Sequence, residues 1–272
     1  MRVPLYKRLK YVICKQLILL LGCSIRLLPS CSFRYFLYEK IFEKYFGWRK
    51  VGYKGKTKFG AKINLELPDS IQTKIFLTGE WESNITKLIS SSLRSGDIFV
   101  DIGANIGYYT LLASKCVGLE GRVYAFEASP MIYNKLEANV KDNAIENAIL
   151  QNVAISDDLG ECSTWTAPEG NLGHSTVIEK VAISDGHTRE AVVKADKLGS
   201  LMPVNDLLQA RMIKIDVEGA ERLVVSGILQ HFAQFSTTTE WLIEISSVFL
   251  PGGKLDADWI FKQFIDMGYS AY

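Results

Sequence analysis

The sequence predicts an α/β fold in which a doubly wound, mostly parallel sheet carries helices on both faces. From Asp97 onward, short apolar runs alternate with amphipathic segments, which is the pattern of consecutive β-α-β units. Two of these runs end in turns that carry glycines and carboxylates, as expected at the ligand-binding edge of such a sheet. With 272 residues, 48% of them hydrophobic, the chain can bury one large core and carry an N-terminal attachment.

The individual elements follow from these patterns. Apolar runs predict five strands, at Ile98–Ile102, Val123–Glu127, Ile149–Ile155, Met212–Val217 and Trp241–Ile245. Amphipathic segments predict four helices, near Gly107–Val117, Pro130–Asp142, Ala220–His231 and Asp256–Met267.

Two further regions flank or interrupt this pattern. Upstream we expect two short strands around the turn Pro68–Asp69 and then a helix, at Lys58–Leu67, Lys74–Leu77 and Ser83–Leu93. A long insertion, Ser156–Leu208, separates the third and fourth strands. Its alternating pieces predict added β-structure over the carboxyl edge of the sheet, at Cys162–Ala167, Ser175–Val181 and Glu190–Val193.

Charge divides the chain into two parts. Residues 1–62 hold 15 Lys/Arg and 2 Asp/Glu, a net charge of +13, whereas residues 63–272 carry −12. We therefore predict a basic, amphipathic N-terminal region at residues 1–66 and a catalytic domain at residues 67–272. The basic region is also rich in aromatic and aliphatic residues, which favours an anionic membrane surface or a polyanionic partner such as a glycan over nucleic acid.

The segment Tyr11–Ile25 is too short between its charges to span a bilayer, because Lys15 interrupts it. Two interpretations stay open: a helix lying in the membrane interface, with its lysines and arginines near anionic headgroups, or a helical cap packed on the catalytic domain. The five cysteines form no C-x-x-C pair, so we expect a reducing compartment. The predicted location is cytoplasmic, with peripheral contact at the inner membrane face.

A cofactor motif follows the first predicted strand. In FVDIGANIG, the strand ends at Asp101, and Gly103 and Gly107 allow the backbone to turn tightly and approach a ligand. Glu127 closes the next strand, where a carboxylate can accept two ribose hydroxyls. The spacing D-x-G-x-N-x-G, with Asn105 in the turn, departs from the G-x-G-x-x-G of dinucleotide sites. Asp101 repels phosphate but suits the amino group of a methionine moiety, which favours S-adenosylmethionine (SAM) over a nicotinamide cofactor.

A second motif, MIKIDVEGAE, places carboxylates at the end of the fourth predicted strand. Glu218 and Glu221 can simply complement a helix dipole. Asp216 is harder to explain in that way, because a carboxylate that ends an apolar strand loses hydration unless something pairs with it. His174, in a glycine-containing turn of the insertion, is a further candidate, although a histidine of a surface loop is the simpler interpretation.

With these two motifs, the sequence resembles the FkbM-type methyltransferases, a family of SAM-dependent enzymes of Rossmann-like, class I architecture. The resemblance runs from Thr78 to Tyr269 and includes GEWE at Gly79–Glu82, YAFEASP, NLGHS at Asn171–Ser175 and IKIDVEGAE. It implies that SAM is held by Asp101, Gly103, Asn105, Gly107 and Glu127, with Asn152 and Ala154 beside the adenine. Class I enzymes usually end in an antiparallel strand pair, and Gly268–Tyr272 resembles only its beginning, so we expect a truncated C-terminus.

The resemblance implies O-methylation of a sugar, a glycan or a natural product, and we expect a role in polysaccharide biosynthesis. Asp216 is the first candidate for general base or acceptor-orienting residue, followed by Glu218 and His174. No ligand spacing for a metal is evident. Two other classes stay open: a non-catalytic binding or scaffold protein that keeps the fold, and a nicotinamide oxidoreductase.

Overall fold

The computed structural model describes residues 51–67, 69–167, 172–245 and 250–270, together with 16, 17, 20, 22, 24, 25, 27, 28, 33, 34, 36–38 and 40. The predictions for Tyr11–Ile25 and for the end of Gly268–Tyr272 lie largely outside these residues. The chain divides into two compact units, residues 1–83 with 169–171 and residues 84–168 with 172–272. The domain boundary between residues 66 and 67 stays a prediction. No helix among the described residues is long and apolar enough to cross a membrane.

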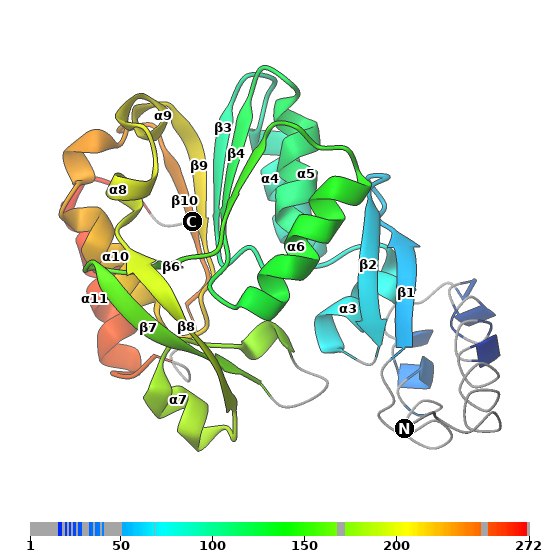
Figure 1. Ribbon diagram of the computed structural model, residues 1–272. Coiled ribbons are helices and arrows are strands. Elements are labelled where there is room, and N and C mark those ends of the chain that lie inside the picture. The colour runs from blue at the N-terminus through cyan, green and yellow to red at the C-terminus, as the bar shows by residue number, and fades with distance from the viewer. Residues whose placement is uncertain are drawn as a thin grey trace. The chain divides into compact units, whose positions relative to one another are not determined.

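The described part of the first unit consists mainly of a hairpin and a helix (Figure 1). Strands β1 (Val51–Lys56) and β2 (Lys62–Leu67) pair antiparallel, and α3 (Ser70–Thr78) follows. The predicted strand Lys74–Leu77 is therefore wrong, since it lies inside α3. Residues next to this helix determine where it begins and ends. The Asp69 carboxylate caps its N-terminus by accepting a hydrogen bond from Gln72 N at 3.0 Å, and Gly79 ends it with a φ of 74°.

The second unit contains the predicted doubly wound sheet. Its five parallel strands lie in the order β10-β9-β3-β4-β5. They are β3 (Ile98–Ile102), β4 (Arg122–Phe126), β5 (Ala148–Gln151), β9 (Ala210–Ile215) and β10 (Glu240–Ile243). This confirms the predicted fold class.

Helices cover both faces of this sheet (Figure 1). One face carries α4 (Ser83–Ser92), α5 (Tyr108–Val117) and α6 (Pro130–Asp142). The other carries α8 (Leu198–Leu201), α9 (Val204–Leu208), α10 (Glu221–Leu229) and α11 (Lys254–Asp266), with the short 3₁₀ turn η2 (Phe232–Gln234) after α10.

The predicted strand Ile149–Ile155 is split in the structure. It forms β5 in the central sheet and the short β6 (Ala154–Ile155), which joins the insertion instead. The break falls at Asn152, whose side-chain amide donates to the carbonyls of Glu127 and Ala128 at 2.8 and 2.9 Å. These bonds hold Asn152 against the loop that follows β4, at the point where the pairing of β5 with β4 ends.

The insertion forms the predicted extra β-structure, a sheet in the order β6-β8-β7. Strands β7 (Gly160–Thr166) and β8 (Thr188–Asp196) pair antiparallel. The predicted strand Ser175–Val181 is wrong, apart from a single bridge between Thr176 and Trp165. This part of the chain forms a 3₁₀ turn, η1 (Leu172–His174), and α7 (Glu179–Ser184), which buries Ala182.

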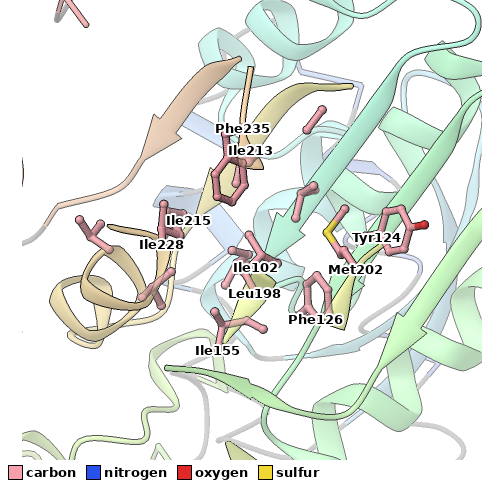
Figure 2. Close-up of a cluster of buried hydrophobic side chains, with 14 of the residues drawn as sticks. Ile102, Tyr124, Phe126, Ile155, Leu198, Met202, Ile213, Ile215, Ile228 and Phe235 are labelled. Carbon is pink, nitrogen blue, oxygen red and sulfur yellow. The ribbon is translucent and has the colours of Figure 1, made fainter. Parts of the chain in front are cut away.

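A hydrophobic cluster fixes the strands from the side of α8 and α10 (Figure 2). Alternate strand residues supply it, among them Val100, Ile102, Tyr124, Phe126, Ile213 and Ile215. Because side chains alternate along a strand, the residues between them face the opposite layer, where α5 lies. Asp101 and Lys214 are two such residues, and each is buried with an exposed fraction of at most 4%.

Candidate active site

Acidic residues gather where the parallel strands end. The sheet ladder continues one residue beyond each strand: Asp216 N donates to Ile102 O, Glu127 N to Gln151 O and Glu244 N to Ile215 O, at 2.9–3.1 Å. These bonds place the three carboxylate-bearing residues along one edge of the sheet. This is the edge at which doubly wound folds bind small molecules.

The glycine turn after β3 brings the two sequence motifs into contact. Gly103 has φ 77°, and a Cβ atom there would lie 1.8 Å from the carbonyl oxygen of Asp216. Only glycine permits this approach of two backbones. Asn105 also has a positive φ, 51°, and Gly107 stands at the start of α5 with φ 90°. The turn after β3 is therefore packed against the backbone that follows β9.

The Glu127 carboxylate is held from both sides by backbone amides. Its Oε2 accepts from Asn105 N and its Oε1 from Ser129 N, both at 2.9 Å. Burial raises the pKa of Glu127 to about 7, although these two hydrogen bonds act to lower it. Each oxygen keeps a second lone pair, so the ionised carboxylate can accept two further hydrogen bonds.

The segment after β5 supports this carboxylate. The Asn152 side chain bonds the backbone of Glu127 and Ala128, and Ala154 is buried in β6. Asn152 thus contributes through the position of the Glu127 loop. Its predicted place beside an adenine, with that of Ala154, stays a prediction.

A buried ion cluster joins β3 to β9. The ammonium of Lys214 lies 2.9 Å from Asp216 Oδ2 and 3.8 Å from Asp101 Oδ1. Asp101 Oδ2 accepts from the hydroxyl of Thr110 at 2.7 Å. Burial raises the pKa of Asp101, against the opposing effects of Lys214 and Thr110. Burial also acts to lower the pKa of Lys214, but Asp216 and Asp101 outweigh it, so that pKa is raised and the side chain is a cation.

The partner that Asp216 requires is therefore Lys214, which the sequence interpretation missed. The sequence does contain a signal for this pair. Lys214 lies inside the apolar strand two residues before Asp216, and residues two apart in a strand face the same side of the sheet. The ammonium also lies over the ring of Tyr109, 5.2 Å from its centroid. Thr110 was missed as well, because nothing in the sequence of α5 distinguishes a hydroxyl that faces Asp101. The predicted contact of Asp101 with a methionine amino group stays a prediction.

Glu218 lies in a strained and acidic loop. Its φ is 51°, and its carbonyl oxygen accepts from the Thr176 hydroxyl of the insertion at 2.8 Å. Burial raises the pKa of Glu218 to about 8, with further contributions from Asp216 and Glu244. Glu221 binds the backbone N–H of Gly219, as expected of an acid at a helix start.

The insertion brings His174 to the same region without an assigned role for its ring. Its carbonyl oxygen accepts from the Nε2 of His187 at 2.8 Å, and Thr176, two residues on, reaches Glu218. Asn171 of the predicted turn lies outside the described residues. A catalytic role for His174, like those for Asp216 and Glu218, stays a prediction.

The arrangement fits a nucleoside better than a dinucleotide. Glu127, oriented by two backbone amides, offers its remaining lone pairs to a ribose diol. Asp216, with 24% of its side chain exposed, and Glu218 follow on the same edge. A pyrophosphate at this edge would lie near these carboxylates, and the cation beside them, Lys214, is buried and already paired with Asp216.

Two curated proteins are similar to this chain in sequence. The chain is 28% identical over 161 residues to the 31-O-demethyl-FK506 methyltransferase FkbM of Streptomyces tacrolimicus, covering 50% of this chain and 61% of that protein. It is 25% identical over 170 residues to the hexuronic acid methyltransferase AglP of Haloferax volcanii, covering 62% and 65%. The chain thus spans somewhat less than two thirds of the length of these curated relatives.

Among solved structures, a SAM-dependent O-methyltransferase from Thermotoga maritima is similar, with a TM-score of 0.42 and 13% identity over 83% of this chain and 65% of that one. The model of the methyltransferase FkbM domain matches residues 101–270, which run from Asp101 of the first motif through the insertion and the second motif. The chain therefore belongs to the FkbM methyltransferase domain family.

Proposed function

We propose that this protein is a SAM-dependent methyltransferase that O-methylates a hydroxyl of a sugar, a glycan or a natural product. The observation that carries the proposal is the Glu127 carboxylate, which ends β4 and is oriented by two backbone amides with lone pairs to spare. Family membership supports SAM as the donor.

In this proposal, Glu127 binds the two ribose hydroxyls, and the turn from Gly103 to Gly107 lies against the nucleoside. When bound, SAM supplies an electrophilic methyl group on a sulfonium. The chain's own task is to hold the acceptor oxygen close to that group and to remove its proton. Proton removal by a positioned side chain contributes about 10²- to 10⁴-fold.

The two acidic candidates suit different tasks. The Lys214 ammonium, 2.9 Å from Asp216 Oδ2, holds the Asp216 carboxylate in place, which suits Asp216 to orient a hydroxyl as its hydrogen-bond acceptor. Glu218, with its pKa raised to about 8, suits proton removal once it is ionised. We therefore assign acceptor orientation to Asp216 and proton removal to Glu218.

The acceptor class is inferred from the relatives. One relative is named for a hexuronic acid and the other for 31-O-demethyl-FK506, which supports a hydroxyl of a sugar or a natural product as the acceptor. The basic residues 1–62 support a site near an anionic membrane, where lipid-linked glycans are built. The proposed acceptor is a hydroxyl of such a glycan.

Calorimetric titration with SAM, adenosine and NAD tests the cofactor assignment. We expect SAM to bind most tightly, and Glu127→Gln to weaken it by about 10- to 100-fold, the loss of one or two charged hydrogen bonds. Glu137→Gln, at an exposed position of α6, is the matched control and should leave the affinity unchanged. A preference for NAD, or equal affinity for SAM and adenosine, contradicts the proposal.

Transfer of labelled methyl groups from SAM to glycan and membrane extracts tests the reaction itself. Mass spectrometry of surface glycans from cells with and without the protein should show a difference of one CH₂ group. SAM binding without any labelled product would instead indicate a non-catalytic binding or scaffold protein.

A further inference from the structure

A carboxylate of the insertion lies against the loop that presents Glu127. Glu190, in β8, accepts hydrogen bonds from the Ser129 hydroxyl and from Met131 N, both at 2.8 Å. The Thr166 hydroxyl of β7 donates to the same carboxylate at 3.0 Å. Glu190 thus connects two strands of the insertion sheet to the beginning of α6.

These bonds complete the N-terminus of α6. Pro130 is its first residue and has no N–H to satisfy, while Ile132 N donates to Ser129 Oγ at 3.2 Å. Met131 N finds its acceptor in Glu190, far along the chain. A carboxylate at this position also complements the positive end of the helix dipole.

Ser129 binds both carboxylates at once. Its backbone N–H donates to Glu127 Oε1, and its side-chain hydroxyl donates to Glu190 Oε2. Besides burial, which has the largest effect, the charges of Asp101 and Glu190 raise the pKa of Glu127. Glu190 therefore acts on Glu127 in two ways: it fixes the loop, and it opposes ionisation.

We propose that Glu190 is a positioning residue for the nucleoside site, through which the insertion sheet holds the Glu127 loop in place. Glu190 need not touch the ligand. The inference rests on the proposed function, because it assigns Glu190 to the same SAM pocket. With Glu190, the insertion contributes to the support of the pocket. The insertion also contacts the Glu218 loop, through the hydroxyl of Thr176.

Two substitutions separate the two effects. Glu190→Gln keeps the shape and one acceptor oxygen but removes the charge, whereas Glu190→Ala removes the connection altogether. The probe is 5′-methylthioadenosine, which carries the ribose diol but no amino acid group that titrates in the neutral range. Its affinity is measured by calorimetry from about pH 5.5 to about pH 8.5, the range around the pKa of Glu127.

For the unsubstituted protein, we expect affinity to rise with pH and to reach half of its gain near pH 7, where Glu127 ionises. Glu190→Gln should move this midpoint down by roughly half a pH unit, since one opposing charge is gone. Glu190→Ala should in addition lower the affinity on the alkaline plateau by about tenfold. Glu161→Gln, at an exposed position of β7, should change neither quantity.

An unchanged midpoint in Glu190→Gln, or an unchanged plateau in Glu190→Ala, overturns the inference while leaving the SAM site intact. If Glu190→Gln shifts the midpoint of the pH dependence but keeps the full affinity on the alkaline plateau, Glu190 does more than support folding. Failure of the unsubstituted protein to bind either 5′-methylthioadenosine or SAM overturns the proposed function, and this inference with it.

Discussion

Replacing Lys214 by methionine removes the one cation from the cluster that joins β3 to β9. At an effective dielectric of about 20, a unit charge pair at 2.9 Å is worth roughly 6 kcal/mol and one at 3.8 Å roughly 4 kcal/mol, before desolvation is subtracted. Desolvation of the buried ammonium cancels much of this gain. Removing one partner of a buried pair typically costs about 3–5 kcal/mol, because the other charge is left uncompensated. We expect a loss of that size for Lys214→Met.

Urea denaturation at several pH values measures this loss. Burial already raises the pKa of Asp101, and without Lys214 this pKa rises further. The folded variant then keeps a proton on Asp101 at pH values at which the unfolded chain has released it. The loss should therefore be larger at about pH 8 than at about pH 5. Lys194→Met is the matched control: Lys194 also precedes its aspartate by two residues in a strand, at 2.7 Å, but 56% of its side chain is exposed. Its loss should stay below about 1 kcal/mol. Equal losses for the two variants, or a loss at Lys214 that does not vary with pH, would refute the argument.

Three further changes test the site. Gly103→Ala should destabilise the protein by more than about 3 kcal/mol in urea denaturation, because its Cβ meets the backbone of Asp216, whereas Gly186→Ala, with a similar φ of 71° and open space, should cost about 1–2 kcal/mol. Methyl transfer should rise with pH through about 8 as Glu218 ionises, and Glu218→Gln should abolish that rise; a profile that keeps its rise excludes Glu218 as the base. Asn139→Ala removes the hydrogen bond to Ile106 O, 2.7 Å long, in the cofactor turn, and should lower the unfolding free energy by about 1–3 kcal/mol; no change in thermal melting would contradict this.

Two elements were predicted to the residue because a boundary signal stood beside a clear hydrophobic pattern. Ile98–Ile102 is an apolar run closed by a glycine turn, and Pro130–Asp142 begins at a serine cap followed by proline. Both match the structure to the residue. The apolar run at Lys74–Leu77 is too short for its period to separate helix from strand. Asp69 and Gly79, which cap the helix there, were the better signal.

The candidate site could be predicted at the level of motifs but not of partners. The residues of the glycine turn and Glu127 lie along one edge because parallel strands end there. The bonds of Lys214 and Glu190 depend on which strands become neighbours, and no local pattern determines that. Glu190 lies in a strand that the sequence predicts, but no sequence pattern predicts its contact with Ser129.

The register of β3 and β9 pairs Asp101 directly with Lys214. Side chains reverse their facing with every residue, so a shift of one position would carry the lysine into the hydrophobic cluster on the opposite layer. A hybrid protein that takes one of these two strands from a relative therefore has to inherit the other as well. For recombination within the family, residues 98–107 and 210–219 form a single unit of exchange, although they lie far apart in the chain.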